Sequence, residues 1–485
     1  MQNLLPVPVS LSISDEKVYE DHLLAEGQET RYSVRLSDIG YRPLYYRIGE
    51  KPLMVVFSLG FRSVVETSSW MRRNLGIETL WISRQVKGYR WEPAQNILGA
   101  DLLTAIKALE MRRNLDNVVA FMVHMAAPHS GPWRFKSRIP KVKVISLLYD
   151  AMNLWLPREK LHLWKEYTKA KGANEGEYAA LEELLRGDYI EGLVYKDYGP
   201  GWPFLKTTNC PTQWFPSTVP RTLFQAPPDP KRIPERFCFI GTIMPHRSHD
   251  RPAGLFADIF MDRVFRQAAD QGYHIHAYVV KPDPEVVQEY QQKFPEGTVR
   301  LFPGTFLNEL LFRLRGRYKW GWMMYEYPCP HVMPLVENTL PTKLFTYMAL
   351  AIPPVVSEEM HAVARFVREH EVGVVVSQEQ QKRLRPILEG QNYPQLLENI
   401  LKVREEFCLE NQIPHLGHFV ERVMKGPYKP PPKNPLFLRF DEEFYEQEKQ
   451  QVQPVLPEEK ARRLSSWLDH SREDDFSEMF GAARE

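Results

Sequence analysis

The sequence predicts an α/β protein of two doubly wound, Rossmann-like domains that face each other across a cleft, with a helical C-terminal extension. Three observations predict this fold. Short apolar runs alternate with amphipathic segments at the spacing of buried parallel strands and their covering helices. A proline-dense stretch at 199–235 divides the alternation into two series, as an ordered linker between domains does. From about residue 384 the pattern is helical, without further strands.

The first series predicts a mostly parallel sheet, because its apolar runs are continuous and do not alternate with polar residues. Within residues 1–50, apolar and polar residues alternate, which predicts a β-rich lead-in before the sheet. We therefore expect a first domain at 1–220 and a linker at 221–235. The predicted strands of the first series are 52–60, 78–83, 117–124, 142–150 and 189–197.

The second series begins afresh at Phe237, where the run Phe-Cys-Phe-Ile-Gly ends in a glycine. It predicts a second domain at 236–383, closing helices at 384–426 and a charged tail at 427–485. Open parallel sheets bind ligands at the carboxyl ends of their strands, so both sheets are expected to direct functional loops into the cleft. The predicted strands of this series are 237–243, 274–280, 298–304, 319–326, 353–357 and 371–377.

The composition is that of a soluble globular protein, with 43% hydrophobic and 25% charged residues. Because 62 basic residues nearly balance 61 acidic ones, no global field favours nucleic acid or an anionic membrane. The four cysteines are far apart and form no CxxC pair, which argues against a disulfide framework and a cysteine zinc site. No leader peptide or spanning apolar run is evident, so we expect a cytoplasmic protein.

The stretch Asn338–Ser357 carries the clearest functional pattern. Its Pro-Thr-Lys at 341–343 opens a short apolar helix, and proline is favoured at the first helical position. The free backbone N–H groups and the positive end of a helix attract anions. Lys343 adds a full charge and Thr342 adds a hydroxyl donor. The pattern therefore predicts a diphosphate-binding site at the start of this helix.

This stretch and the two-domain alternation resemble the sugar-nucleotide-dependent glycosyltransferases of the GT-B fold, closest to the glycogen-synthase-like and capsule- or lipopolysaccharide-type retaining enzymes. The second domain of that family carries a pattern like P-x-K-L-F-E-Y-L-A-x-G-x-P-V-V, followed by a helix and a G-V-V-V strand. The resemblance covers about 237–376, and the N-terminal half is similar only in architecture. It implies a nucleotide-diphosphate-sugar donor on the second domain, an acceptor hydroxyl on the first, polysaccharide biosynthesis, and no cofactor or metal.

The resemblance also implies roles for particular residues. Arg247 and Lys343 would stabilise the leaving diphosphate, and Asp150 or His124 would serve the acceptor hydroxyl. For Arg247, Asp150 and His124 an ordinary structural role is also open: a solvated charge, a helix cap and a core histidine. The expected donor-binding residues are Gly241, Thr242, Arg247, Glu326, His331, Asn338, Thr342, Lys343 and Thr346.

The sequence departs from the family pattern at three positions. Thr346 replaces the glutamate that grips the ribose, Asn338 replaces a second glutamate, and Ala351 replaces a glycine. These departures favour an alternative, in which a catalytically degenerate GT-B protein binds a sugar nucleotide or a glycan as a scaffold. A further alternative is a viral-type DNA-base glycosyltransferase, although the balanced charge makes nucleic acid an unfavoured partner.

One loop, 129–141, interleaves aromatic and basic residues. Exposed loops of this kind contact lipid headgroups or lipid-linked acceptors, and a solvated loop is the alternative. The loop therefore predicts an acceptor contact, or a peripheral contact with the inner face of the membrane. The residues expected to make it are Trp133, Arg134, Phe135 and Lys136.

Overall fold

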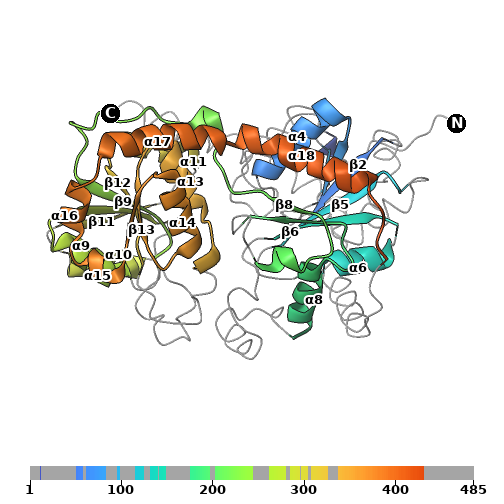
Figure 1. The fold of residues 1–485 in the computed structure, drawn as a ribbon, viewed down its shortest axis with the longest axis horizontal. Coiled ribbons are helices and arrows are strands. Elements are labelled where there is room, and N and C mark those ends of the chain that lie inside the picture. The colour runs from blue at the N-terminus through green and yellow to red at the C-terminus, as the bar shows by residue number, and fades with distance from the viewer. Residues whose placement is uncertain are drawn as a thin grey trace, which may run out of the picture.

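The computed structural model contains two parallel sheets, each with its own helices, and a helical segment that connects them (Figure 1). The residues that it describes are 11–12, 51–57, 62–82, 96–98, 115–124, 131–139, 141–148, 175–196, 203–243, 261–279, 284–294, 297–303, 307–325 and 337–430. The predicted lead-in other than 11–12 and the predicted tail beyond 430 lie outside these residues.

The first sheet has eight strands in the order β1-β4-β3-β2-β5-β6-β7-β8. Every neighbouring pair is parallel except β1 and β4, which are antiparallel. The five central runs predicted as buried strands are found here, and most of their described side chains are excluded from solvent. The strands are β1 (Leu11–Ser12), β2 (Leu53–Phe57), β3 (Glu78–Ile82), β4 (Asn96–Leu98), β5 (Val118–His124), β6 (Lys143–Leu148), β7 (Gly192–Tyr195) and β8 (Thr212–Trp214).

The second sheet has six parallel strands in the order β11-β10-β9-β12-β13-β14. The chain leaves β9 toward one edge and returns to β12 to build the other edge, so the strand order reverses between β9 and β12. With two doubly wound sheets and a helical C-terminal region, the predicted fold class is confirmed. The strands are β9 (Arg236–Gly241), β10 (His274–Val279), β11 (Val299–Pro303), β12 (Trp320–Met323), β13 (Pro354–Ser357) and β14 (Val374–Val376).

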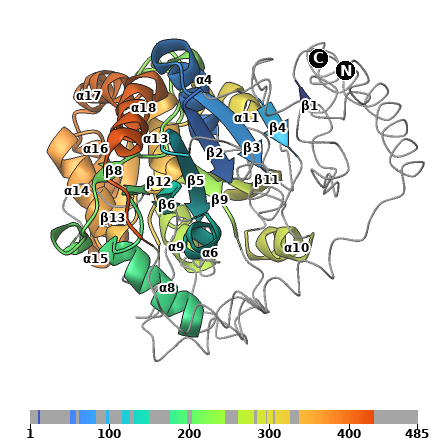
Figure 2. The ribbon, with the colours of Figure 1, turned by 90° about the vertical axis from the view of Figure 1, so that its right-hand side faces the viewer.

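Helices cover both sheets (Figures 1 and 2). Among the described residues, the sequence did not predict helices α4, α6 and α15, the short helices η3 and η4, or strands β4 and β8. Strand β8 lies inside the proline-dense stretch and adds an edge strand to the first sheet. The helices are α4 (Arg62–Leu75), α6 (Gly131–Arg138), α8 (Glu175–Arg186), η3 (Pro203–Lys206), η4 (Arg221–Leu223), α9 (Met261–Ala269), α10 (Pro284–Lys293), α11 (Leu307–Leu314), α13 (Thr342–Ala349), α14 (His361–His370), α15 (Gln378–Gln381), α16 (Leu384–Glu389), α17 (Tyr393–Glu406) and α18 (Leu409–Lys425).

The last two helices connect the two halves of the molecule. Figure 1 shows α17 over the second sheet and α18 over the first. Close packing of α18 requires glycine on both sides: a Cβ at Gly417 would lie 2.5 Å from the Trp70 ring, and one at Gly192 would lie 2.9 Å from Phe419. The apolar face of α18 therefore completes the core of the first domain.

The linker and the junction of α17 with α18 bind each other. Arg221 donates from its backbone N–H to both carboxylate oxygens of Glu410 (3.0 and 2.9 Å) and from its guanidinium to Glu405 (2.8 Å). Arg404 of α17 donates to the carbonyl of Gln225 (2.7 Å). The two chain segments that cross between the halves are thus joined into one connection. Among the described residues, no helix is long and apolar enough to cross a membrane.

Helix α6 corrects the prediction of an exposed aromatic-basic loop. Phe135 and Lys136 are wholly buried, and the Phe135 ring lies 5.2 Å from that of Phe57 in an edge-on contact. A surface contact with an acceptor or a membrane is therefore wrong for these two residues, because their side chains complete the domain core. The side chains of Trp133 and Arg134 lie outside the described residues.

Lys136 forms a buried ion pair with Glu191. The other oxygen of this carboxylate accepts the backbone N–H of Val144 (2.6 Å), and Oε1 also accepts the N–H of Lys429 (2.7 Å). The pair thus joins α6, β6 and the segment that follows α18. Burial lowers the pKa of Lys136 to about 8, although the negative charge of Glu191 opposes this shift.

This buried lysine predicts a stability change with pH. In the unfolded chain Lys136 keeps its proton up to its ordinary pKa, whereas the folded protein releases it above pH 8, so folding gains stability as pH rises from 8 to 10. We expect the free energy of unfolding of the wild type to rise by about 2 kcal/mol relative to Lys136→Met over that range. Urea unfolding of both proteins at each pH measures it. Exposed Lys425→Met is the control, and a constant wild-type-minus-variant difference would contradict the assignment.

Candidate functional site

The candidate site lies where the strand order of the second sheet reverses. Strands β9 and β12 pair over two residues only, Phe237 with Trp320 and Cys238 with Gly321. Beyond these pairs no further pairing of the two strands is found among the described residues. Open α/β sheets bind ligands at the carboxyl ends of their strands at such a switch point.

Helix α13 is seated at this switch point by Tyr347. The hydroxyl of Tyr347 lies 2.9 Å from the carbonyl oxygen of Cys238 and 3.1 Å from that of Trp322, and it accepts the N–H of Ile240 (3.2 Å). It therefore supplies the hydrogen bonds that the diverging strands do not give each other. Gly321 makes room for the ring, since a Cβ there would lie 2.7 Å from it. Burial raises the pKa of Tyr347 well above its ordinary value, so the hydroxyl stays protonated.

The N-terminus of α13 reaches the protein surface. Pro341 is the N-cap (φ −70°, ψ 147°), so the helix begins at Thr342, one residue later than the sequence predicted, and no side chain caps it. Thr342 is exposed and Lys343 is partly exposed, so the start of the helix is not packed shut. The positive end of the helix dipole is therefore accessible to an anion.

Lys343 brings a full positive charge to the same place. Its ammonium donates a hydrogen bond to the hydroxyl of Tyr325, which follows β12. The ammonium also lies 5.0 Å from the ring centre of Phe239 and 4.8 Å from that of Tyr325. Aromatic faces at this distance attract a cation. The charge is thus held between the carboxyl ends of β9 and β12.

Gly241 allows this close approach. A Cβ at Gly241 would lie 2.9 Å from Cζ of Phe239 and 3.3 Å from Nζ of Lys343. The glycine predicted to admit a ligand to the backbone therefore lies beside the lysine predicted to bind phosphate. Thr242 follows it in the chain and is exposed.

Tyr325 is fixed from behind by a polar network. Its backbone N–H donates to Oγ of the buried Ser357 (2.9 Å), at the end of β13. The same Oγ accepts a hydrogen bond from the side-chain amide of Gln381 (3.2 Å). The backbone carbonyl of Gln381 in turn accepts one from the side-chain amide of Gln271 (3.0 Å). The network connects α15 and the end of α9 to the strand ends that carry the candidate site.

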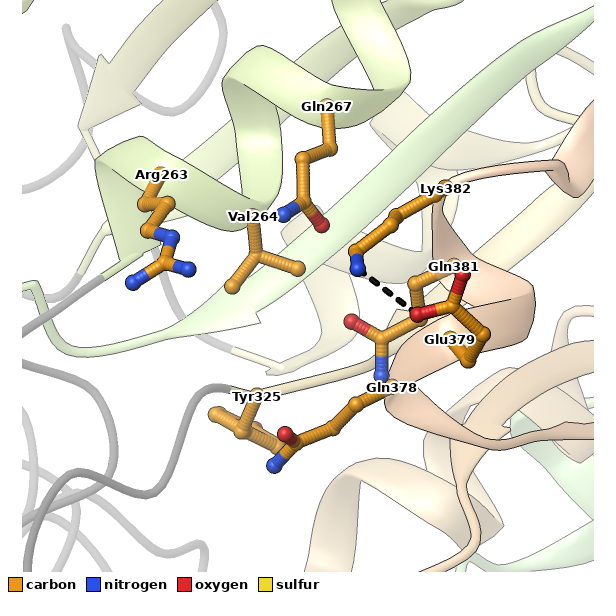
Figure 3. A pocket seen from close by; sticks show the side chains of 8 residues that line it. All are labelled: Arg263, Val264, Gln267, Tyr325, Gln378, Glu379, Gln381 and Lys382. Carbon is orange, nitrogen blue, oxygen red and sulfur yellow. Dashed lines mark hydrogen bonds and ion pairs between the residues drawn. The ribbon is translucent and has the colours of Figure 1, made fainter.

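A polar pocket of about 150 Å³ lies on the other side of Tyr325, between α9 and α15. Figure 3 shows Arg263 and Gln267 extending from α9 toward the same space as Gln378, and Lys382 paired with Glu379. Amide side chains both donate and accept hydrogen bonds, as recognition of hydroxyl groups requires. The residues that line the pocket are Arg263, Val264, Gln267, Tyr325, Gln378, Glu379, Gln381 and Lys382.

The structure brings only part of the predicted site together. Gly241 lies beside Lys343 at the start of α13, their chain neighbours Thr242 and Thr342 are exposed, and Asn338 before the helix is partly buried. Strand β5 ends at His124, whose side chain lies outside the described residues. Other predicted residues lie wholly outside them, and their roles stay predictions; they are Asp150, Arg247, Glu326 and His331.

Thr346 requires a correction. Its hydroxyl donates to the carbonyl of Thr342 (3.1 Å), and the residue is only 2% exposed. A threonine in a helix interior often bonds to the preceding turn in this way. The predicted donor contact of Thr346 is therefore not supported, because its side chain is directed at the helix backbone.

Tyr325 and Phe239 are not among the site residues predicted from the sequence. Both lie in apolar runs that predict buried strands, and each run supplies one ring to Lys343. Their positions close to strand ends were the available signal. Within the described residues, no group of three or more histidine, cysteine, aspartate or glutamate side chains is placed to hold a metal ion.

Ala351 has a left-handed backbone conformation, which glycine adopts more easily than alanine. It has φ of +54°, in the left-handed region, directly after the C-cap Leu350. Its N–H bonds to the carbonyl of Met348 (3.0 Å), and the N–H of Ile352 bonds to that of Tyr347 (2.9 Å). These two bonds form a Schellman motif, in which glycine is usual at this position.

Comparison with known proteins finds likeness of fold only. No protein-family profile and no curated protein sequence matches the chain. The fold is similar to that of a Medicago truncatula protein solved with UDP-glucose, at a TM-score of 0.44 and 8% identity, covering 78% of this chain and 100% of the other. It is also similar to a UDP-forming trehalose-phosphate synthase from Burkholderia xenovorans, at 0.45 and 9%, covering 77% and 100%.

A third similar structure is a glycosyltransferase involved in avilamycin A biosynthesis, at a TM-score of 0.43 and 12% identity, covering 78% of this chain and 99% of the other. Likenesses of this size do not bear on function. The fold assignment rests instead on the two sheets and their strand orders.

The hydrogen bonds of the Tyr347 hydroxyl predict that its removal lowers the stability of the folded protein. Tyr347→Phe leaves the polar groups of Ile240, Cys238 and Trp322 without this partner in a buried place, so the free energy of unfolding should fall by about 1–3 kcal/mol. Urea unfolding measures the change, with the partly exposed Tyr428→Phe as the control. Equal stability of the two variants would argue against this role of Tyr347.

The backbone strain at Ala351 predicts a stabilising substitution. Ala351→Gly removes the steric cost of a Cβ at positive φ, so the free energy of unfolding should rise by up to about 1 kcal/mol. Ala349→Gly, two residues earlier and inside the helix, should lower it by about 1 kcal/mol. Urea unfolding of the two variants, compared with the wild type, gives opposite signs if Ala351 is strained and the same sign if it is not.

Proposed function

We propose that this protein transfers a sugar from a nucleotide-diphosphate sugar to an acceptor hydroxyl. One observation carries the proposal: the Lys343 ammonium lies beside Gly241 at an open helix N-terminus, at the switch point of a doubly wound sheet. A helix N-terminus, a lysine and a close backbone approach are three features that favour a phosphate group at one place.

The chemistry of glycosyl transfer gives this arrangement a role. When the bond between the anomeric carbon and the diphosphate breaks, negative charge grows on the leaving oxygen. The Lys343 ammonium and the start of α13 would stabilise that charge, and Thr342 would donate a further hydrogen bond. Arg247 would contribute a second positive charge, in line with the resemblance that suggested it.

The acceptor hydroxyl would be served by the first domain. His124 ends β5 and is paired with Leu148, near the end of the neighbouring β6. Asp150 follows Leu148 by two residues. Because parallel strands end at the same edge of the sheet, the two candidate bases belong to one edge, and either would deprotonate the acceptor. We expect the two residues to act on one acceptor site.

A scaffold without turnover is the second candidate. It is favoured by Thr346, whose hydroxyl is engaged with its own helix where a glutamate would grip the ribose. Such a protein would bind the sugar nucleotide through the same phosphate contacts. Binding and turnover must therefore be measured separately.

Binding is tested by thermal unfolding with UDP, GDP, ADP and their sugars. A nucleotide at 100 times its Kd stabilises the folded protein by about 2.7 kcal/mol, which appears as a rise in Tm. Lys343→Met should remove most of this rise, whereas Lys425→Met, at an exposed lysine of α18, should keep it. If no nucleotide raises the Tm of the wild type, the phosphate site is refuted.

Turnover is tested by release of nucleoside diphosphate from the sugar nucleotide that binds. Release that Lys343→Met abolishes supports the transferase. Binding without release, over a panel of hydroxyl acceptors, supports the scaffold.

A further inference from the structure

We infer that Tyr325 is a positioning residue for Lys343, so that phosphate affinity depends on a tyrosine that need not touch the ligand. The inference rests on the proposed function, since it concerns the same phosphate site. Tyr325 lies outside α13 and outside the Pro-Thr-Lys motif from which the phosphate site was predicted.

The first argument is the freedom of a lysine side chain. An ammonium on a four-carbon stem loses considerable rotamer entropy when a ligand fixes it. In this structure Tyr325 already accepts a hydrogen bond from the Lys343 ammonium, and Phe239 lies under the same charge at 5.0 Å. The cost of ordering the lysine is therefore met during folding, which raises the affinity for an anion that needs it there.

The second argument is the rigidity of Tyr325 itself. The residue is only 3% exposed and lies two positions after the end of β12. Its backbone N–H is held by Ser357, which in turn is held by Gln381. A hydroxyl on such a fixed ring can hold the Lys343 ammonium in one position, whereas a hydroxyl on a mobile side chain cannot.

The third argument is the direction in which the lysine is held. The contacts with Tyr325 and Phe239 place the ammonium beside Gly241, at the end of β9, where a Cβ would lie 3.3 Å from Nζ. Without the Tyr325 hydroxyl the same charge would remain on α13, but it would lose the hydrogen bond that directs it toward β12. Lys343 thus supplies the positive charge, and Tyr325 fixes the position of its ammonium.

The test compares Tyr325→Phe, which removes only the hydroxyl, with Tyr393→Phe, which removes a hydroxyl bonded to the carbonyl of Lys319 elsewhere. The probes are UDP, GDP or ADP, whichever binds the wild type, and the matching nucleoside. We expect Tyr325→Phe to weaken diphosphate binding about 10-fold, the size typical of a hydrogen bond to a charged group. Nucleoside binding should not change, and Tyr393→Phe should bind like the wild type.

A double-mutant cycle tests whether Tyr325 acts through Lys343. In the Lys343→Met background, Tyr325→Phe should have no further effect, because there is no ammonium left to position. A full 10-fold loss in that background, or an equal loss for the nucleoside, would overturn the inference and leave the proposed function intact. A wild type that binds none of the diphosphates would overturn both.

Lys343→Arg provides a second variant with Tyr325 intact, in case Tyr325→Phe does not fold. It keeps the positive charge but replaces a compact ammonium with a planar guanidinium, which cannot occupy the same point. We expect diphosphate affinity to fall at least 5-fold, to about the level of Tyr325→Phe or below. Wild-type affinity in Lys343→Arg would show that charge alone suffices and that its position does not matter.

Discussion

The candidate site depends on the hydrogen bonds that connect β9 and β12 where the two strands stop pairing with each other. Two strands that separate leave backbone donors and acceptors without partners, and burying such groups is costly. The Tyr347 hydroxyl meets this cost by bonding to Ile240 N–H and lying against the carbonyls of Cys238 and Trp322. Because Tyr347 belongs to α13, the same bonds that satisfy the sheet also fix the helix whose start carries Lys343.

Rigidity around the switch point comes from aromatic packing and polar networks together. Trp322 packs edge-on against Phe237 and Phe265, at ring distances of 5.0 and 4.9 Å, beneath the strand ends. The Ser357 and Gln381 network holds the segment after β12. Both act on residues that are buried, while Thr342 and Gly241 remain accessible above them. A rigid base below an open surface is the arrangement that a pre-organised anion site needs.

The departures from the glycosyltransferase pattern differ in their consequences. Ala351 takes the backbone conformation of the glycine it replaces, so the fold is kept at an energetic cost. Thr346 keeps the helix but directs its hydroxyl to Thr342 instead of a ligand. The first departure concerns stability and the second concerns recognition. A protein that keeps the phosphate contacts but changes the ribose contact is expected to bind its nucleotide differently from the family pattern.

The sequence by itself determined the local elements. Continuous apolar runs identified the five central strands of the first sheet and the six strands of the second, and Pro-Thr-Lys identified the start of α13, because strand burial and helix initiation depend on neighbouring residues. The tertiary structure alone decided which side chains meet. It placed Tyr325 and Phe239 around Lys343, turned Thr346 inward and buried Lys136 with Glu191 in what the sequence presented as an exposed loop. The Thr346 hydroxyl bonds one helical turn back, to Thr342, but the contacts of Lys343 and of Lys136 join residues from different elements, and no local pattern encodes them.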